Sequence, residues 1–322
     1  MGLSWDYLRM IPHEWISPCI CNKWGKAMNK ALRDKKAILF FILPAALLFT
    51  LVLFGPILYA GYISLCDWNA LTKPKFIGFG NFKALFTKDD IFLTSLKNSI
   101  FFMIFSLITQ QIIGLILAAI LSGLRYGKNV YKNIIYLPCV LSSAALGLLF
   151  SFILKPNMGL NQLLAIFGIQ GPNWLMSVNG YIPLTMWVIG VVALWIYVGT
   201  TMMLYMAGIA GIDKSLLEAA YIDGAGKTKT FFYVTLPLLK PMARTTISLT
   251  CIGSLKFFDL VYNMTQGGPN NKTQTMATWL YFEGFSYFKY GYASAISIVL
   301  LIMCLLVTLI INKCISIKDF EN

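Results

Sequence analysis

The sequence predicts an all-α fold, a polytopic membrane bundle of six transmembrane helices. Apolar residues make up 58% of the 322 residues and charged residues only 12%, whereas a soluble domain carries about one quarter charged residues. A helix needs roughly 20 residues to cross an apolar core of about 30 Å. Six predominantly apolar windows of about that size occur, at residues 38–65, 99–121, 133–154, 182–208, 245–262 and 292–311.

The basic residues lie between these windows, and their distribution predicts that both termini are cytoplasmic. If the N-terminus is inside and the six spans alternate, 17 Lys and Arg residues fall on the cytoplasmic side and nine on the other. An excess of this kind is what the positive-inside rule requires. It accounts for the net charge of +13 without a nucleic-acid partner, which would need a basic solvated face. We therefore expect membrane lipid, and no nucleic acid, around this chain.

Three segments are expected along the chain. Residues 1–37 form a cytoplasmic N-terminal segment, in which Trp24 and Met28 follow the helical spacing of an interfacial helix; a disordered basic tail would have the same composition. Residues 38–312 form the transmembrane permease domain and residues 313–322 a cytoplasmic tail. His13, Cys19 and Cys21 offer only three ligands at a spacing unsuited to zinc, so no metal site is expected.

The longest cytoplasmic loop, residues 209–241, has a pattern that a self-contained membrane bundle does not need. Asp213 is placed to cap a short helix, Gly224 to end it and Pro237 to stop a second helix. The first helix carries an apolar stripe too short to cross a membrane, formed by Leu216, Leu217, Ala220 and Tyr221. Such a stripe predicts binding in a groove on a partner protein.

This loop resembles the coupling loop of permease subunits in binding-protein-dependent ABC importers of the maltose and glycerol-3-phosphate type. The family's pattern is Glu-Ala-Ala, three residues, Gly and a later Leu-Pro, and it is matched here by Glu218, Ala219, Ala220, Asp223 and Gly224. The resemblance implies that the loop docks on an ATPase subunit, with the glutamate facing a basic residue there. Residues 224–228 also look like the end of a phosphate-binding loop, but Tyr221 replaces its first glycine. We expect no nucleotide or other cofactor on this chain.

Three further motifs extend the resemblance over nearly all of the chain after residue 37. They lie at residues 76–82, 265–270 and 291–295. The resemblance implies a second, homologous permease subunit in a heterodimer, two ATPase subunits that bind the ATP and an extracellular solute-binding protein. It also implies a location in a bacterial or archaeal plasma (inner) membrane. The solute would be a sugar or oligosaccharide, with a polyol or a glycerophosphate ester left open by the sequence.

A sugar presents apolar ring faces and a rim of hydroxyls, so its pathway needs aromatic platforms and uncharged hydrogen-bonding groups. The residues expected by resemblance to line this pathway are Ser142, Ser143, Trp195, Tyr197, Thr200, Ser254 and Phe257. The alternative is that these side chains only pack the helices together. Lys256 and Asp259 are expected to pair with each other near the outer end, because an unpaired charge in a membrane is costly.

Two other classes of membrane protein fit the sequence less well. A proton- or sodium-driven transporter would carry ionisable residues deep in several spans, and only Lys256 and Asp259 have such positions. A membrane enzyme would need paired carboxylates or a nucleophile beside a base, and the single histidine, His13, does not provide them. The sequence therefore predicts a transport subunit with no catalytic residues, whose ATPase activity resides in partner subunits.

Overall fold

The computed structural model describes residues 35–124, 126–177 and 179–315, which are mostly helical. The predicted interfacial helix at the N-terminus lies outside the described residues. The chain divides into two compact units, one ending at Tyr59 and one beginning at Ala60. In the first unit, α2 (Lys35–Phe49) leads into a π-helical turn, η3 (Thr50–Phe54), and the beginning of α3 (Gly55–Ser64).

The second unit begins with a small assembly of two strands and a helix that joins two of the sequence motifs. After α3 come an antiparallel pair of strands, β1 (Cys66–Asp67) and β2 (Lys75–Phe76), and then α4 (Gly80–Thr87). The Asn81 side-chain amide donates hydrogen bonds to the carbonyl oxygens of Ser64 and Cys66, at 2.8 and 2.9 Å. Gly291 packs on the same strand, where a Cβ would overlap the Cys66 carbonyl oxygen. The 76–82 and 291–295 motifs therefore have a shared structural role.

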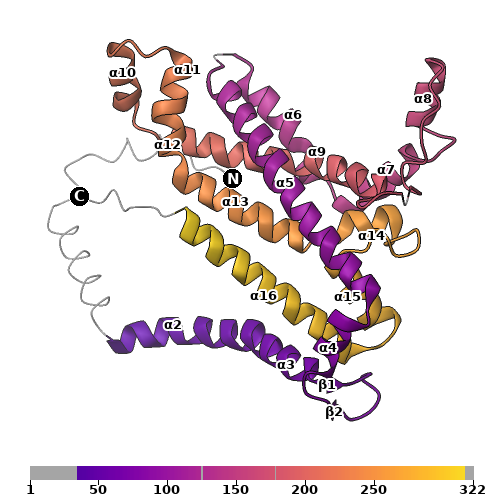
Figure 1. Cartoon of the computed structure of the whole chain (residues 1–322). Helices are drawn as coiled ribbons and strands as arrows, with labels where there is room; N and C mark the ends of the chain where they lie inside the picture. Colours follow the sequence, from indigo (N-terminus) through magenta and orange to yellow (C-terminus); the bar gives the residue numbers. More distant parts are fainter. Residues whose placement is uncertain (1–34, 125, 178, 316–322) are drawn as a thin grey trace, which may run out of the picture. The chain divides into compact units, whose positions relative to one another are not determined.

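The long helices of the second unit pack side by side (Figure 1). They are α5 (Asp90–Ser122), α6 (Lys128–Val140), α7 (Ser143–Ile153), α9 (Leu184–Ala210), α13 (Lys240–Leu255) and α16 (Tyr290–Cys314). Small residues allow some of the closest crossings, as membrane helix packing favours. At Gly199 on α9, for example, a Cβ would lie 2.7 Å from the Ile135 carbonyl oxygen of α6.

Shorter helices close the unit at its two ends (Figure 1). At one end lie α8 (Leu160–Ile166), α14 (Asp259–Thr265), α15 (Met276–Tyr281) and the π-helical turn η5 (Phe282–Ser286). At this end the Asp89 carboxylate caps α5 by accepting a hydrogen bond from the Phe92 amide at 2.8 Å. It also accepts hydrogen bonds from Trp279 Nε1 of α15 at 3.0 Å and from Tyr292 Oη of α16 at 2.8 Å, which connects these two helices to α5. The opposite end carries α10 (Lys214–Ile222), α11 (Lys227–Thr230), the π-helical turn η4 (Phe231–Thr235) and α12 (Leu236–Leu238).

The predicted membrane-spanning windows are confirmed only in part. Within the described residues four helices are long and apolar enough to cross a membrane, namely Ile42–Ser64, α5, α9 and α16, or five if a bent pair is one span. That pair is α6 and α7, which meet at 90° within the 133–154 window. The 245–262 window holds α13 and α14, separated by a break at residues 256–258. Pro138 in α6 predicts a kink in the 133–154 window, and the chain bends there, at residues 141–142. The break in the 245–262 window was not expected, and the count of six spans stays a prediction.

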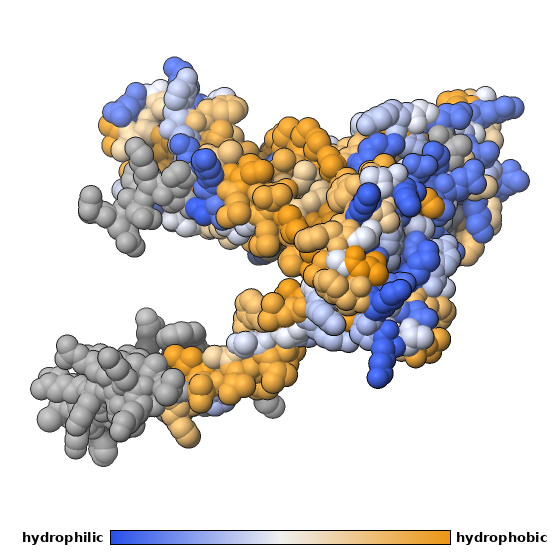
Figure 2. All heavy atoms as spheres, turned by 60° about the horizontal axis from the view of Figure 1, so that its bottom comes forward, coloured by the Kyte–Doolittle hydropathy of each residue, from blue (hydrophilic) through white to orange (hydrophobic). Residues whose placement is uncertain are grey.

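The surface of the second unit has the distribution of a membrane protein. In Figure 2, hydrophilic residues gather toward the two ends of this unit and a broad hydrophobic surface lies between them. Large apolar side chains remain exposed along the long helices, including Ile108 and Ile112 on α5 and Leu305 and Leu309 on α16. Lipid tails are as apolar as these side chains, so the hydrophobic effect does not favour burying them inside the protein. Their exposure is therefore expected of helices that lie in a bilayer.

Candidate functional site

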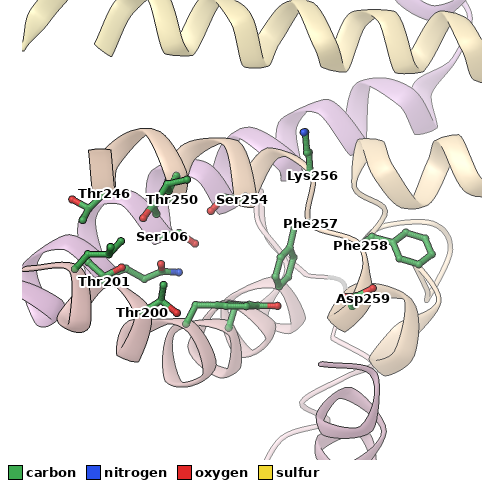
Figure 3. Close-up of a pocket in the computed structure, with 16 residues that line it drawn as sticks. Ser106, Thr200, Thr201, Thr246, Thr250, Ser254, Lys256, Phe257, Phe258 and Asp259 are labelled. Atoms are coloured by element: carbon green, nitrogen blue, oxygen red, sulfur yellow. The ribbon is translucent and has the colours of Figure 1, made fainter. Parts of the chain in front are cut away.

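A cavity of about 300 Å³ lies between α5, α9 and α13 (Figure 3). Its polar lining comes mostly from uncharged side chains, namely Ser106, Gln110, Tyr197, Thr200, Thr201, Thr246, Thr250 and Ser254. Gln110 and Ser254 are each only 6% exposed, and within the described chain no hydrogen bond from a protein group satisfies either side chain. Unused donors and acceptors in an otherwise apolar bundle can bind a neutral, hydrogen-bonding solute.

Aromatic rings form one wall of this cavity. The Phe257 ring lies 4.9 Å from the Phe102 ring and 6.4 Å from the Tyr197 ring, measured between centroids. Both Phe257 and Tyr197 line the cavity. Apolar ring faces beside hydroxyl and amide groups are complementary to a molecule that has both apolar faces and polar edges.

A hydrogen-bond network centred on Gln111 holds the three helices around the cavity. Its Oε1 accepts from Tyr205 Oη of α9 at 2.8 Å and from Thr246 Oγ1 of α13 at 3.0 Å. Its Nε2 donates to Thr250 Oγ1 of α13 at 2.8 Å. Gln110 and Gln111 were not among the predicted pathway residues, although two adjacent amides inside an apolar window are a visible signal.

The predicted ion pair between Lys256 and Asp259 is not formed. Asp259 Oδ2 instead accepts a hydrogen bond from Ser143 Oγ at 2.7 Å, and in the part of the chain that is described the only salt bridge joins Lys289 to Glu283. Figure 3 shows Lys256 pointing away from Asp259 across the break between α13 and α14. Two side chains at i and i+3 meet only on one continuous helix, and the break at residues 256–258 removes that geometry.

Four of the seven residues predicted to line a pathway come together at the cavity: Tyr197, Thr200, Ser254 and Phe257. Ser143 is held beside it through Asp259, which is a lining residue. Ser142 caps α7. Trp195 does not line the cavity, because its indole packs 5.6 Å from the Phe150 ring and is 47% exposed. Helical periodicity explains the difference, since positions 195 and 197 lie on different faces of α9.

The loop between α9 and α13 forms the second candidate site. The Asp213 carboxylate caps α10 by accepting from the Ser215 amide at 3.0 Å, and this hydrogen bond lowers the pKa of Asp213. Gly224 ends the helix at φ +76°, where its amide donates to the Tyr221 carbonyl oxygen at 3.0 Å. The Ala225 amide donates to the Ala220 carbonyl oxygen at 2.9 Å, which completes a Schellman motif.

No residue of α10 is buried. Glu218, Ala219, Asp223 and Gly224 are exposed and Ala220 is partly exposed. Beside them the apolar side chains of Tyr221 and Ile222 are 80% and 84% exposed. Adjacent large apolar side chains with this exposure are typical of a surface that binds another protein.

The second part of this loop ends one residue later than the sequence predicts. Helical structure runs from α11 through η4 and α12 to Leu238, one residue beyond Pro237, and α13 begins after a turn at Leu239. Pro237 lies in the first turn of α12, where a missing amide donor is tolerated.

Three comparisons place this architecture among known proteins. Residues 110–314 match the family model described as "Binding-protein-dependent transport system inner membrane component". The probable ABC transporter permease protein YurN of Bacillus subtilis (strain 168) is 35% identical over 288 residues, covering 88% of this chain and 97% of YurN. The lactose transport system permease protein LacF of Rhizobium radiobacter is 34% identical over 82% of this chain and 88% of LacF.

A solved structure has the same fold. A chain of a bacterial alginate ABC transporter, crystallised in complex with an alginate pentasaccharide-bound periplasmic protein, superposes with a TM-score of 0.76. The alignment covers 89% of this chain and 96% of that chain at 21% sequence identity.

Proposed function

The chain belongs to the family of binding-protein-dependent transport system inner membrane components, and from this we propose that it is the permease subunit of an ATP-driven sugar importer. Its relatives include permeases named for lactose, arabinooligosaccharides and multiple sugars. The observation that carries the proposal is the cavity between α5, α9 and α13, which combines aromatic rings with uncharged hydrogen-bonding side chains. This lining suits a neutral sugar or oligosaccharide.

The energy for import comes from partner subunits in this proposal. Two ATPase subunits bind and hydrolyse ATP, a second, homologous permease subunit completes the pathway, and an extracellular solute-binding protein delivers the sugar. Both termini are cytoplasmic in the plasma membrane of a bacterium or archaeon, which places α10 on the ATPase side. The exposure of α10 supports this arrangement, because none of its apolar side chains is buried within the described chain.

Transport proceeds by alternating access. ATP binding closes the two ATPases, and α10 passes their movement to α9 and α13, between which the loop is anchored. Leu239, which follows α12, is 1% exposed and packs in one apolar cluster with Met202 and Met206 of α9. A displacement of the loop therefore moves packed helices rather than a free segment, and these helices carry most of the cavity lining.

The test uses the complete importer in proteoliposomes, with its ATPases, second permease and binding protein. We expect ATP-dependent accumulation of a labelled sugar by the wild-type complex. Glu218→Lys should abolish accumulation and ATPase co-purification while leaving membrane insertion intact, whereas Lys229→Glu, on the neighbouring α11, serves as a charge-change control in the same loop. Full accumulation by Glu218→Lys would contradict docking through α10, and uptake without ATP would contradict the importer class.

A further inference from the structure

A side chain from the segment just before α15 bridges the break between α13 and α14. The break lies at residues 256–258. In a continuous helix the Phe257 carbonyl oxygen would accept a hydrogen bond from the Val261 amide, four residues later. Here it accepts from Thr275 Oγ1 at 2.8 Å, and Thr275 is fully buried. A buried hydroxyl therefore fixes the backbone at a residue whose ring lines the cavity.

The segment that carries this hydroxyl is itself fixed to α5. We call residues 272–276 the anchored segment. Asn98 Nδ2 of α5 donates to the carbonyl oxygens of Lys272 and Gln274, at 2.9 and 2.8 Å. One residue further along α5, Ser99 Oγ accepts from the last amide of the anchored segment at 3.0 Å. Asn98 and Ser99 are both 0% exposed, so water does not compete for these three hydrogen bonds.

The same helix also supports the Phe257 ring. Phe102 lies four residues after Asn98, on the same face of α5, and its ring centroid is 4.9 Å from that of Phe257. Helix α5 therefore holds Phe257 in two ways, directly through a ring contact and indirectly through the anchored segment and Thr275. A residue that is fixed both at its backbone and through its ring has a defined position in the cavity wall.

Capping of α15 does not account for the hydrogen bond to Phe257. Thr275 begins a capping box, in which its Oγ1 accepts from the Thr278 amide at 3.4 Å and Thr278 Oγ1 accepts from the Thr275 amide at 2.8 Å. A cap uses the hydroxyl of Thr275 only as an acceptor, which leaves its single proton for the Phe257 carbonyl oxygen. The donor side of Thr275 therefore serves the break and not α15.

We propose that Thr275 is a positioning residue for the solute cavity, because its hydroxyl holds the break after α13 in the geometry that keeps the Phe257 ring in the cavity wall. Thr275 is not itself among the lining residues. Without its hydroxyl, the Phe257 carbonyl oxygen has to take another donor, and the ring turns with the backbone that carries it. This inference rests on the proposed sugar-import function and assigns part of the cavity's affinity to a residue outside it.

The experiment measures equilibrium binding of a labelled saccharide to the complex of both permeases and both ATPases in nanodiscs, with the solute-binding protein left out. The probe is the member of a panel of labelled neutral di- and trisaccharides that the complete wild-type importer accumulates fastest. Thr275→Val keeps the shape of the side chain and removes the hydroxyl, whereas Thr275→Ser keeps the hydroxyl. Thr278→Val is the matched control, because it removes the other half of the capping box and leaves the donor to Phe257 in place.

Thr275→Val should weaken saccharide binding about two- to tenfold, the size of one aromatic contact, and Thr275→Ser should restore it. Thr278→Val should lower the thermal unfolding midpoint but keep the wild-type affinity. Phe257→Leu should also weaken binding, and adding Thr275→Val to it should cause no further loss, because the hydroxyl acts through the ring. Equal losses in Thr275→Val and Thr278→Val would overturn the proposal, as would additive losses in the double variant.

A second readout does not depend on the saccharide. Trifluoromethyl-phenylalanine in place of Phe257 reports the surroundings of the ring through its fluorine NMR resonance. Thr275→Val should shift or broaden this resonance and Thr278→Val should leave it unchanged; an unchanged resonance in Thr275→Val would overturn the proposal. Thr275→Ala replaces Thr275→Val if the latter does not assemble. A wild-type complex that imports no saccharide would instead refute the proposed function, and the resonance would still decide the role of Thr275.

Discussion

Gly224 offers the sharpest test of how the α10 loop acts. It holds φ +76° at the end of α10, a backbone conformation that costs most residues with a Cβ roughly 1–2 kcal/mol. Asn and Asp adopt it more readily. No atom of the described chain lies within 4 Å of a Cβ placed at Gly224. A new side chain there therefore meets only solvent or a partner protein.

These facts separate a backbone effect from a docking effect. Gly224→Ala should weaken binding of the ATPase about fivefold, because roughly 1 kcal/mol is lost in holding the helix end. Gly224→Asn should have a smaller effect, since its backbone strain is lower. Gly224→Asp shares that low strain but brings a charge into the interface, where an unpaired charge costs about 2–5 kcal/mol, or at least thirtyfold in affinity.

The assay is titration of purified ATPase onto the permease in nanodiscs, followed by uptake in proteoliposomes. Thermal unfolding measured without the ATPase should be alike in Gly224→Asn and Gly224→Asp, because their backbone strain is similar and the surroundings of the position are open. Gly224→Ala should lower the midpoint slightly through its larger strain. If Gly224→Asp binds the ATPase as well as Gly224→Asn does, the side chain meets no partner and the docking argument is refuted.

Other consequences of the structure can be measured independently. Gly291→Ala should lower the free energy of unfolding, measured by thermal unfolding in detergent, by about 1–3 kcal/mol, because its Cβ overlaps the Cys66 carbonyl oxygen. Gly253→Ala is the control, because a Cβ at Gly253 meets open space, and it should leave the unfolding midpoint unchanged or raise it. Gln111→Leu should cost about 0.6–2 kcal/mol by the same measurement, since three hydrogen bonds between helices are lost, and an unchanged midpoint would show that this network does not hold the helices. Exchanging the charges of Lys256 and Asp259 should fail to restore uptake lost in the single variants, because the two side chains are not paired; restoration would mean that they pair in another state of the transport cycle.

The sequence predicted the class of fold from its low charge and from the length of its apolar windows, which are properties of single segments. Low charge and long apolar windows require helices in a membrane, because every backbone polar group there must be satisfied within its own segment. α5, α9 and α16 confirm three windows as uninterrupted helices. The resemblance carried by residues 213–241 likewise predicted the family, which the comparisons confirm.

The sequence was less informative where neighbouring helices decide the conformation. Pro138 predicts a kink in the 133–154 window, but composition gives neither the 90° angle between α6 and α7 nor the break after α13. Interruptions of this kind are stable only when other helices satisfy the freed backbone groups, and composition does not report those neighbours. The same break explains why Asp259 binds Ser143 rather than Lys256.

By itself, the amino-acid sequence determined that this chain is an all-α membrane protein of a transport family and that α10 has a cap, a glycine end and an apolar stripe. The membrane class follows from apolar windows of roughly 20 residues, and the features of α10 depend on residues within one or two helical turns. Only the tertiary structure decided which side chains share the cavity and that Trp195 packs on Phe150 instead. The reason is physical: a helix turns 100° per residue, so small changes in packing and direction decide which face meets which neighbour.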